Sequence, residues 1–410
     1  MKEKLLGIIG VIPFLSHWIL PDGMEASCYI RLGSLPFYIF NVFLFVYIIL
    51  NHQVVKNNIF VSPKIKSVTI SVICLLLVYT IYNFAINQVD NFFLLLLNNQ
   101  SLICASFIYL LFPMTIKMID STKYVVVPTL VIVCVEVILY SLGILTYTQD
   151  FGGTSYSGVM RVSTTVGGCT GTGVAIIMLA VLVNEVYKIG KKTKIFLLLL
   201  TTIAVLFTVS RGPILIWGGY VVIFIYRQYL RGAKLAVKMK FLIYFSIILS
   251  TFIYYGLFDP ILERNDDLSE SSYALGTGRE EKNEEGIRLM LNSGGLGIGN
   301  GQTNIDKSLR GLVKESNHIG IHNYYITILA ELGVFGLMIT IFYFLFLIKN
   351  FDFTKTFAYY ALLLLIVSFS IEPVFTYAEF MMPAFFIIMI TLKRKKRSTR
   401  SVLKRELYYK

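Results

Sequence analysis

The chain has 410 residues, of which 56% are hydrophobic and only 15% are charged. Soluble domains carry about 25% charged residues, so this composition excludes an ordinary soluble globular protein and indicates a membrane protein. The formal net charge of +13 would suit nucleic-acid binding, but the distribution of the basic residues along the chain argues against it.

Apolar runs of about 17–25 residues recur along the chain, and each is long enough to cross the hydrocarbon core as a helix. The first run has no small-residue cleavage site after it, so we interpret it as a span. About twelve spans are predicted, at 4–20, 34–50, 67–87, 92–112, 124–147, 166–187, 195–209, 212–226, 241–258, 321–347, 356–371 and 376–391. The predicted fold class is an all-α polytopic integral membrane protein, with a single membrane domain over residues 1–410.

The basic residues divide the predicted connections into two sides. If both termini are cytoplasmic, the inner connections hold most of the lysines, and the short outer connections hold only Arg31, Arg161 and Arg211. This bias follows the positive-inside rule, so the positive charge reflects topology and contact with anionic membrane lipid. Residues 393–410, which include KRKKRSTR, are predicted to be a basic cytoplasmic tail. We therefore do not expect nucleic acid as a partner.

One predicted extracytoplasmic loop, residues 259–320, is much longer than the others. It holds eleven acidic and seven basic residues. Long loops cross the membrane whatever their charge, and such loops usually serve a function when they are ordered. A short helix is predicted around EEKNEEGIRLMLNS, where Ile287, Met290 and Leu291 share a face. The next stretch, SGGLGIGNG, lacks the βαβ context of a nucleotide site, so we interpret it as a lid or turn.

The candidates for chemistry in the outer connections are Arg211, Arg279, Arg288 and His322. Arg211 lies in the tight turn Ser210–Pro213, and one structural interpretation is a snorkelling anchor. The alternative is phosphate binding. Pro213 suits the first turn of a helix, where free backbone N–H groups and a guanidinium together attract an anion.

The two loop arginines and Arg161 also have structural interpretations. Arg279 could be a solvated loop charge, and Arg288 could pair with Glu284 at helical spacing. Arg161 lies in the outer segment from Phe151 to Gly173, where many small residues would let a helix or a ligand approach closely.

His322 stands at the start of a predicted span and has two interpretations. With Asn323 it could cap the next helix, or it could serve as a general acid or base near neutral pH. Gly333 and Gly336 follow at a spacing that lets another helix pack closely. Glu331 is a costly carboxylate within the same span, and is either functional or a hydrogen-bonded core residue.

This span resembles the signature of the O-antigen ligase and polysaccharide polymerase superfamily. In that signature a histidine and an asparagine are followed by nine residues, a glycine, two residues and a second glycine. His322, Asn323, Gly333 and Gly336 fit it.

Two further elements of the resemblance lie upstream. Arg211 and Leu215 fit an arginine followed by a leucine on an outer turn. Gly278–Arg279 fits a Gly-Arg pair that opens the helical part of the large outer loop, and GGLGIGNG fits a glycine-rich turn before the His-Asn helix. The ordered set covers roughly residues 205–345. The family often places a tryptophan shortly after the loop arginine, and GREEKNEEGIRLM has none, so Arg279 and Arg288 remain alternatives.

The resemblance implies a metal-independent glycosyltransferase without cofactors, similar in fold to the helical membrane glycosyltransferases of the GT-C type. It would use undecaprenyl-diphosphate-linked sugars at the outer leaflet of the bacterial cytoplasmic (inner) membrane. Arg211 and Arg279 would grip the diphosphate, and His322 would orient or deprotonate the acceptor hydroxyl. The expected substrate-binding residues are Arg288, Asn323, Ser210 and Arg161.

The shared motifs leave the exact reaction open. A Wzy-type polymerase for capsule or O-antigen would move a growing chain onto a lipid-linked repeat unit, and a ligase would move it onto another acceptor. The composition resembles that of AT-rich genomes, as in many Gram-positive cocci, which lack lipid A, so we favour a capsule polymerase. A flippase for the same lipid-linked repeat is the competing class, although transporters usually show internal repeats. The resemblance also suggests a chain-length regulator and a flippase of the same pathway as partners.

Overall fold

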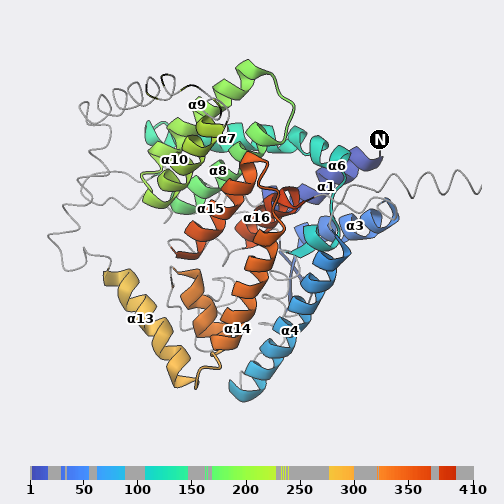
Figure 1. Cartoon of the computed structure of the whole chain (residues 1–410), viewed down its shortest axis with the longest axis vertical. Helices are drawn as coiled ribbons and strands as arrows, with labels where there is room; N and C mark the ends of the chain where they lie inside the picture. The colour runs from blue at the N-terminus through green and yellow to red at the C-terminus, as the bar shows by residue number, and fades with distance from the viewer. Residues whose placement is uncertain are drawn as a thin grey trace, which may run out of the picture.

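A computed structural model describes residues 2–16, 29–32, 35–54, 62–87, 107–145, 162, 164, 169–227, 232, 234, 236, 239, 277–299, 321, 323–370 and 378–393. These residues are mostly helical (Figure 1). The helices are α1 (Lys2–Ser16), α3 (Ile39–Val54), α4 (Pro63–Asn87), α6 (Ile116–Ser121), α7 (Lys123–Ser141), α8 (Cys169–Glu185), α9 (Lys191–Phe207), α10 (Arg211–Ile225), α13 (Thr277–Asn292), α14 (Tyr324–Lys349), α15 (Thr356–Ser370) and α16 (Ala378–Thr391). The strands are β1 (Tyr29–Leu32) and β2 (Leu35–Tyr38).

Helix α8 lies at the centre of the described helices. Its residues from Val174 to Val183 are all apolar and almost completely buried. A helix that is apolar on every side has to be covered on every side, and α8 contacts α7, α9, α10, α15 and α16. It therefore forms a fixed frame against which α10 is positioned.

The two strands depart from the all-α prediction. β1 and β2 pair antiparallel, with Tyr29 opposite Tyr38 and Ile30 opposite Phe37. Aromatic and β-branched residues of this kind favour a pleated strand over a helix. The span predicted at 34–50 therefore begins later, as α3 at Ile39.

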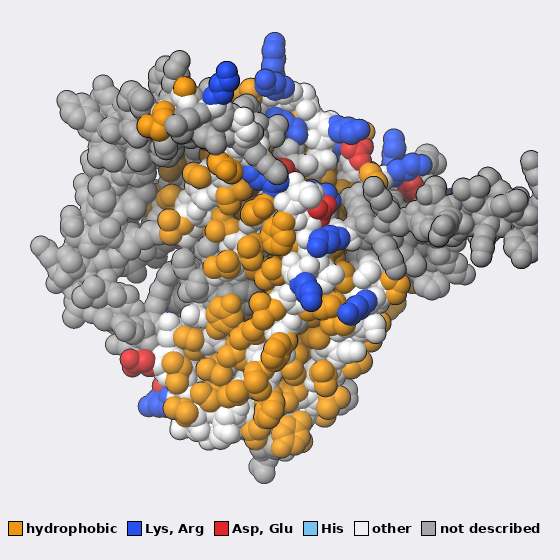
Figure 2. Space-filling view, in the orientation of Figure 1, with side chains coloured by type: hydrophobic (Ala, Val, Ile, Leu, Met, Phe, Trp, Pro, Cys, Tyr) orange, Lys and Arg blue, Asp and Glu red, His pale blue; other side chains and the backbone are white. Residues whose placement is uncertain are grey.

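Large apolar side chains are exposed on the outer surface of several helices. On α4 and α14, which contact each other, Val78 is 64% exposed, Phe335 57% and Phe342 69%. Figure 2 shows hydrophobic side chains spread over the lower part of this face. Apolar surface of this extent marks contact with lipid or another protein.

Two segments of the described chain, Ile116–Ser141 and Tyr324–Lys349, are long and apolar enough to cross a membrane by length and composition. Shorter apolar helices accompany them at Val42–Asn51, Gly171–Glu185, Gly212–Ile225 and Thr356–Ile366. Most of the predicted span 92–112 and all of 241–258 lie outside the described residues. The helical membrane-protein class agrees with these helices, and the number of twelve spans stays a prediction.

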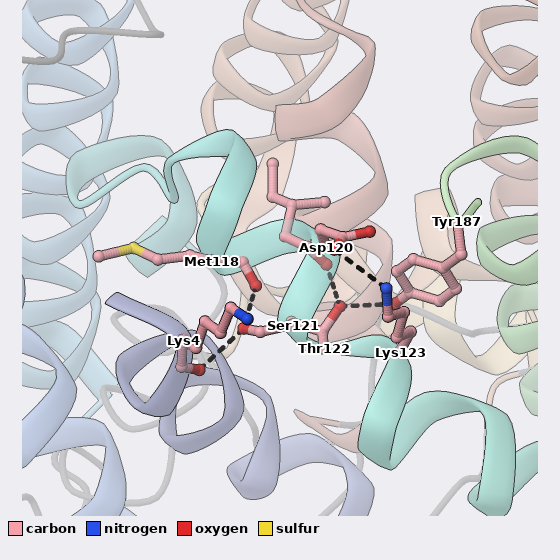
Figure 3. Close-up of polar contacts among 8 residues, drawn as sticks. Lys4, Met118, Asp120, Ser121, Thr122, Lys123 and Tyr187 are labelled. Atoms are coloured by element: carbon pink, nitrogen blue, oxygen red, sulfur yellow. Dashed lines mark hydrogen bonds and ion pairs between the residues drawn. The ribbon is translucent and has the colours of Figure 1, made fainter. Parts of the chain in front are cut away.

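Side-chain hydrogen bonds join the helix ends at the α6–α7 junction (Figure 3). The Ser121 hydroxyl donates to the carbonyl of Lys4 in α1 at 2.8 Å, and Lys123 pairs with Asp120 at 3.0 Å. The hydroxyls of Thr122 and Tyr187 lie 2.5 Å apart, which ties the start of α7 to the residues after α8.

The same set of contacts continues to the ends of α10, α14 and α16. Tyr220 in α10 donates to Glu185 in α8 at 3.1 Å, and Arg227, just after α10, donates to the carbonyl of Phe353 at 3.2 Å. The N–H of Lys393 donates to the carbonyl of Asn350 at 2.9 Å. We call these joined ends the basic end, because its lysines and arginines are Lys2, Lys4, Lys117, Lys123, Lys188, Lys191, Lys192, Lys194, Arg227, Lys349, Lys355 and Lys393.

Candidate active site

Helix α14 is not the single continuous span that was predicted at 321–347. Gly333 has φ 65° and ψ −167°, which is far from helical, and it divides α14 into a first limb, residues 324–332, and a second limb, residues 334–349. A break of this kind removes helical hydrogen bonds, and in an apolar environment the freed backbone groups need other partners.

The glycine-rich turn after α13, residues 293–299, supplies those partners. The N–H groups of Ile298 and Gly299 donate to the carbonyls of Ala330 and Glu331, both at 2.9 Å. The N–H of Val334 donates to the carbonyl of Gly295 at 3.0 Å. Leaving three such groups unpaired and buried would cost about 1–3 kcal/mol each. The turn was predicted to be a lid or turn, and the structure shows it docked on the broken helix.

Glycine is required at both contacting positions of this junction. A Cβ on Gly333 would lie 2.3 Å from the carbonyl oxygen of Gly295, and a Cβ on Gly297 would lie 2.5 Å from that of Glu331. Both residues also have positive φ, 65° and 83°. The prediction that Gly333 serves packing against another helix was therefore wrong. Gly333 allows the break, and a Cβ on Gly336 would meet Leu332 of the first limb at 2.2 Å.

A tyrosine from α4 holds the turn from the other side. The Tyr79 hydroxyl donates to the carbonyl of Leu296 at 2.5 Å. Sequence reasoning missed Tyr79, because one tyrosine in an apolar helix carries no motif. Figure 1 shows α14 with α13 on one side and α4 on the other.

Helix α13 lies against the first limb of α14 and runs in the same direction. A Cβ on Gly286 would meet the side chains of Ile321 and Ile326 at 2.7 and 2.8 Å, so the two elements approach closely there. Further along, Gly295 contacts Gly333. The predicted helix in this loop is confirmed, but Ile287 and Leu291 are 39% and 65% exposed, so the predicted apolar face is not the buried one.

The helical register of α13 separates the two candidate arginines. Position 279 precedes Gly286 by seven residues, which is about two turns, so it falls on the face that packs on α14. Position 288 follows Gly286 by two residues and falls on the opposite face. The Arg288 side chain is 68% exposed and pairs with Glu285, not with Glu284 as predicted. This pairing raises the pKa of Arg288 above its usual value. The side chain of Arg279 lies outside the described part of the structure.

Asn323 begins the first limb of α14 as its N-cap. Its side-chain oxygen accepts from the N–H groups of Tyr325 and Ile326 at 3.0 and 3.3 Å. The capping interpretation of Asn323 is thereby confirmed. His322 lies outside the described residues, directly before this cap.

The turn before Arg211 is strained and closely packed. Val209 has φ 46°, a conformation that is costly for a β-branched residue. Ser210, which is 2% exposed, forms the N-cap of α10. A Cβ on Gly173 of α8 would lie 2.6 Å from the ring of Pro213, so α8 fixes this turn from behind. The close approach predicted for the small residues is confirmed at Gly173. The side chains of Arg211 and Arg161 lie outside the described part of the structure.

α10, which begins at Arg211, and the second limb of α14, which follows Gly333, come together at their C-terminal ends. α10 and the second limb of α14 both finish at the basic end, where Arg227 contacts Phe353. Their lengths of 15 and 16 residues correspond to about 22 and 24 Å. Helix α15 contacts both α10 and α14. Helix α15 thus connects the helix that begins at Arg211 with the broken helix.

Glu331 lies in the first limb of α14 and is 6% exposed. Its backbone carbonyl belongs to the docked junction, which is a structural role. Among the described residues, no three His, Cys, Asp or Glu side chains are grouped closely enough to hold a metal ion.

Residues 196–341 match the family model described as O-Antigen ligase. The matched segment begins in α9 and ends in the second limb of α14, so it includes the Arg211 turn, α13 and the Gly333 break. This segment belongs to the O-antigen ligase family. Members of the O-antigen ligase family are membrane enzymes of the glycosyltransferase type that act on lipid-linked oligosaccharides. Among curated proteins, none matches the chain significantly.

Proposed function

We propose that this protein is a polysaccharide polymerase of the bacterial cytoplasmic membrane. It transfers a growing undecaprenyl-diphosphate-linked glycan onto a lipid-linked repeat unit at the outer leaflet, without a metal ion. The observation that carries the proposal is the docked junction at Gly333, where the turn after α13 pairs through its backbone with the broken helix inside the matched family segment. The Arg211 turn and α13 belong to the same segment, and α10 and the second limb of α14 both finish at the basic end.

The position of the basic end supports the proposed orientation. The start of α1 and Lys393 both belong to this end, and lysines are typical of cytoplasmic connections. We propose that both termini are cytoplasmic, that residues 393–410 are a cytoplasmic tail, and that the loop 259–320 is extracytoplasmic. About twelve spans would then complete a single membrane domain over residues 1–410, similar in fold to GT-C glycosyltransferases.

In the proposed mechanism the arginines act on the lipid diphosphate. Arg211, in the first turn of α10, and Arg279, on the α14-facing side of α13, stabilise the charge that develops as the sugar–diphosphate bond breaks. His322 takes the proton from the acceptor hydroxyl, or orients that hydroxyl for attack. The rigid backbone junction at Gly333 favours these catalytic roles, because small displacements of catalytic groups lower reaction rates strongly.

The remaining site residues are proposed to have supporting roles. Ser210 and Asn323 occupy the N-cap positions next to Arg211 and His322, and the Asn323 side chain caps its helix. The Asn323 amide also keeps its own N–H donors for the glycan. Arg288 would contribute only an outer contact to the glycan, because it is exposed and paired with Glu285. Arg161 would contact the glycan from the segment before α8.

A ligase of the same superfamily is the second candidate, and the family description favours it. A ligase would give the finished glycan to a different acceptor, such as lipid A core. Both reactions use the same donor and the same charge stabilisation, so the acceptor decides between them. A chain-length regulator and a flippase of the pathway are proposed as partners.

The test is glycan transfer by the purified protein in detergent. Lipid-linked repeat units isolated from the producing cells are supplied, and products are separated on a gel. We expect a ladder from wild type, none from His322→Ala, Arg211→Ala or Arg279→Ala, and an unchanged ladder from the control Lys355→Ala at the basic end. Single transfer to lipid A core would indicate the ligase. No transfer, with flipping of the lipid in proteoliposomes, would indicate a transporter and overturn the proposal.

A further inference from the structure

Asn283 of α13 carries a buried hydrogen-bond acceptor that no described residue of the chain uses. Its side-chain oxygen is shielded from solvent and has no hydrogen-bond partner among the described residues. Buried amide oxygens are nearly always paired, because an unpaired one loses its hydration without compensation. A partner that arrives with a ligand would remove this cost.

The register of α13 places Asn283 between the proposed diphosphate site and the α14 contact. It precedes Gly286, which packs on Ile321 and Ile326, by three residues, and it follows Arg279 by four. Positions three and four apart share one face of a helix, with Cβ atoms about 5–6 Å apart. Asn283 therefore lies one turn from Arg279, on the face that packs on α14.

We infer that Asn283 is a further substrate-binding residue, whose side-chain oxygen accepts a hydrogen bond from a hydroxyl of the donor's first sugar. The inference rests on the proposed function. That sugar is bonded directly to the diphosphate, so a group one helical turn from the phosphate-binding arginine meets the sugar and not the lipid. A neutral amide suits this position, because a carboxylate there would repel the diphosphate.

The stability of an Asn283→Leu variant distinguishes sugar binding by Asn283 from a structural role. If the oxygen is unused in the free protein, replacing Asn283 by leucine removes an unpaired buried polar group and keeps a similar volume. The thermal midpoint should then stay the same or rise. If the oxygen instead supports the fold, the same change should lower the midpoint and all activities together.

The test compares two lipids that differ only in their glycan, using purified full-length protein in detergent. Undecaprenyl diphosphate carries no sugar, and the lipid-linked repeat unit isolated from the producing cells carries it. Asn283→Leu should bind undecaprenyl diphosphate as tightly as wild type does. It should bind the repeat unit about 5- to 100-fold more weakly, the range expected when one buried hydrogen bond is lost. Asn292→Leu, an exposed asparagine at the end of the same helix, is the matched control and should change neither affinity.

Other outcomes would overturn the inference. Equal loss of affinity for both lipids, a lowered thermal midpoint, or no change in either affinity would each show that Asn283 does not contact the sugar. If Asn283→Leu fails to fold, wild-type protein is tested with donors that each lack one hydroxyl of the first sugar. Uniform binding across that set would exclude the contact. Wild-type protein that transfers no glycan at all would instead refute the proposed function.

Discussion

The two ends of the helix bundle are built by different means. At the basic end, ordinary side chains join regular helices, as in the Thr122–Tyr187 hydroxyl contact and the Lys123–Asp120 pair. Away from the basic end, the chain uses a broken helix, a glycine-rich turn docked through its backbone, and a strained valine at position 209. The second construction costs more conformational free energy, since it needs positive φ and close backbone contacts.

The difference indicates that irregular backbone replaces regular helix packing in the region where we propose the functional site. Strained or discontinuous backbone persists only where its surroundings hold it, and it gathers at functional sites. The matched family segment contains the irregular end but also contributes α10 to the basic end. Four substitutions, taken from the largest expected effect to the smallest, test whether the contrast between the two ends is real.

Gly333→Ala should have the largest effect. Its Cβ would lie 2.3 Å from the Gly295 carbonyl oxygen, against backbone that cannot rotate away, and φ is 65°. We expect a loss of stability of about 3 kcal/mol or more, from backbone strain together with the clash, and loss of glycan transfer. Thermal unfolding in detergent and the gel assay measure both quantities.

The matched control for this substitution is Gly218→Ala in α10. No heavy atom lies within 4 Å of a Cβ built there, so the change should stabilise the helix by up to about 1 kcal/mol. A Gly333→Ala protein that keeps its thermal midpoint and its activity would mean that the docked turn is not a fixed feature.

Gly173→Ala should have the next largest effect, at the Arg211 turn. The added Cβ would press on the ring of Pro213 at 2.6 Å, and this ring cannot change rotamer freely. Overpacking of this kind costs about 1–3 kcal/mol, and the displaced turn should lower glycan transfer more than binding of the acceptor glycan. A kinetic comparison of kcat with KM for the acceptor checks this. An unchanged kcat would separate the Arg211 turn from the catalytic site.

The sequence predicted the class of the fold and several local features of the site. Apolar runs indicated membrane helices, the charged loop segment indicated α13, and a cap at Asn323 was one of the two interpretations of the His322–Asn323 pair. Each of these follows from composition or from contacts between close neighbours in sequence. The resemblance to the O-antigen ligase superfamily is confirmed over residues 196–341.

The junction at Gly333 could not be predicted, because two glycines three residues apart suit a close helix crossing and a helix break equally well. Both need the absence of a Cβ, and only the docking of the turn decides between them. The roles of Asn283 and Tyr79 depend on the same long-range contacts. The catalytic assignments of Arg211, Arg279 and His322 stay predictions.

Tyr79→Phe and Tyr187→Phe form a matched pair, one at each end. Each removes a single hydroxyl, from the Leu296 carbonyl in one case and from the Thr122 hydroxyl in the other. Each should lower stability by about 1 kcal/mol. Only Tyr79→Phe should also lower glycan transfer, by about 5- to 10-fold, because it loosens the turn that supports the break. Equal activities in the two variants would remove the functional contrast between the ends.

Arg288→Ala should have the smallest effect, although Arg288 is one of the two loop arginines that fit the sequence pattern. Its guanidinium is 68% exposed and pairs with Glu285 on the face of α13 opposite Gly286. Exposed pairs on a helix contribute little to stability, so the thermal midpoint should not change measurably, and glycan transfer should fall by less than about twofold. Arg279→Ala, on the α14-facing side, should abolish transfer in the same assay. If Arg288→Ala were the inactive variant, the assignment by helical register would be reversed, and α13 would have to turn its other face to the substrate.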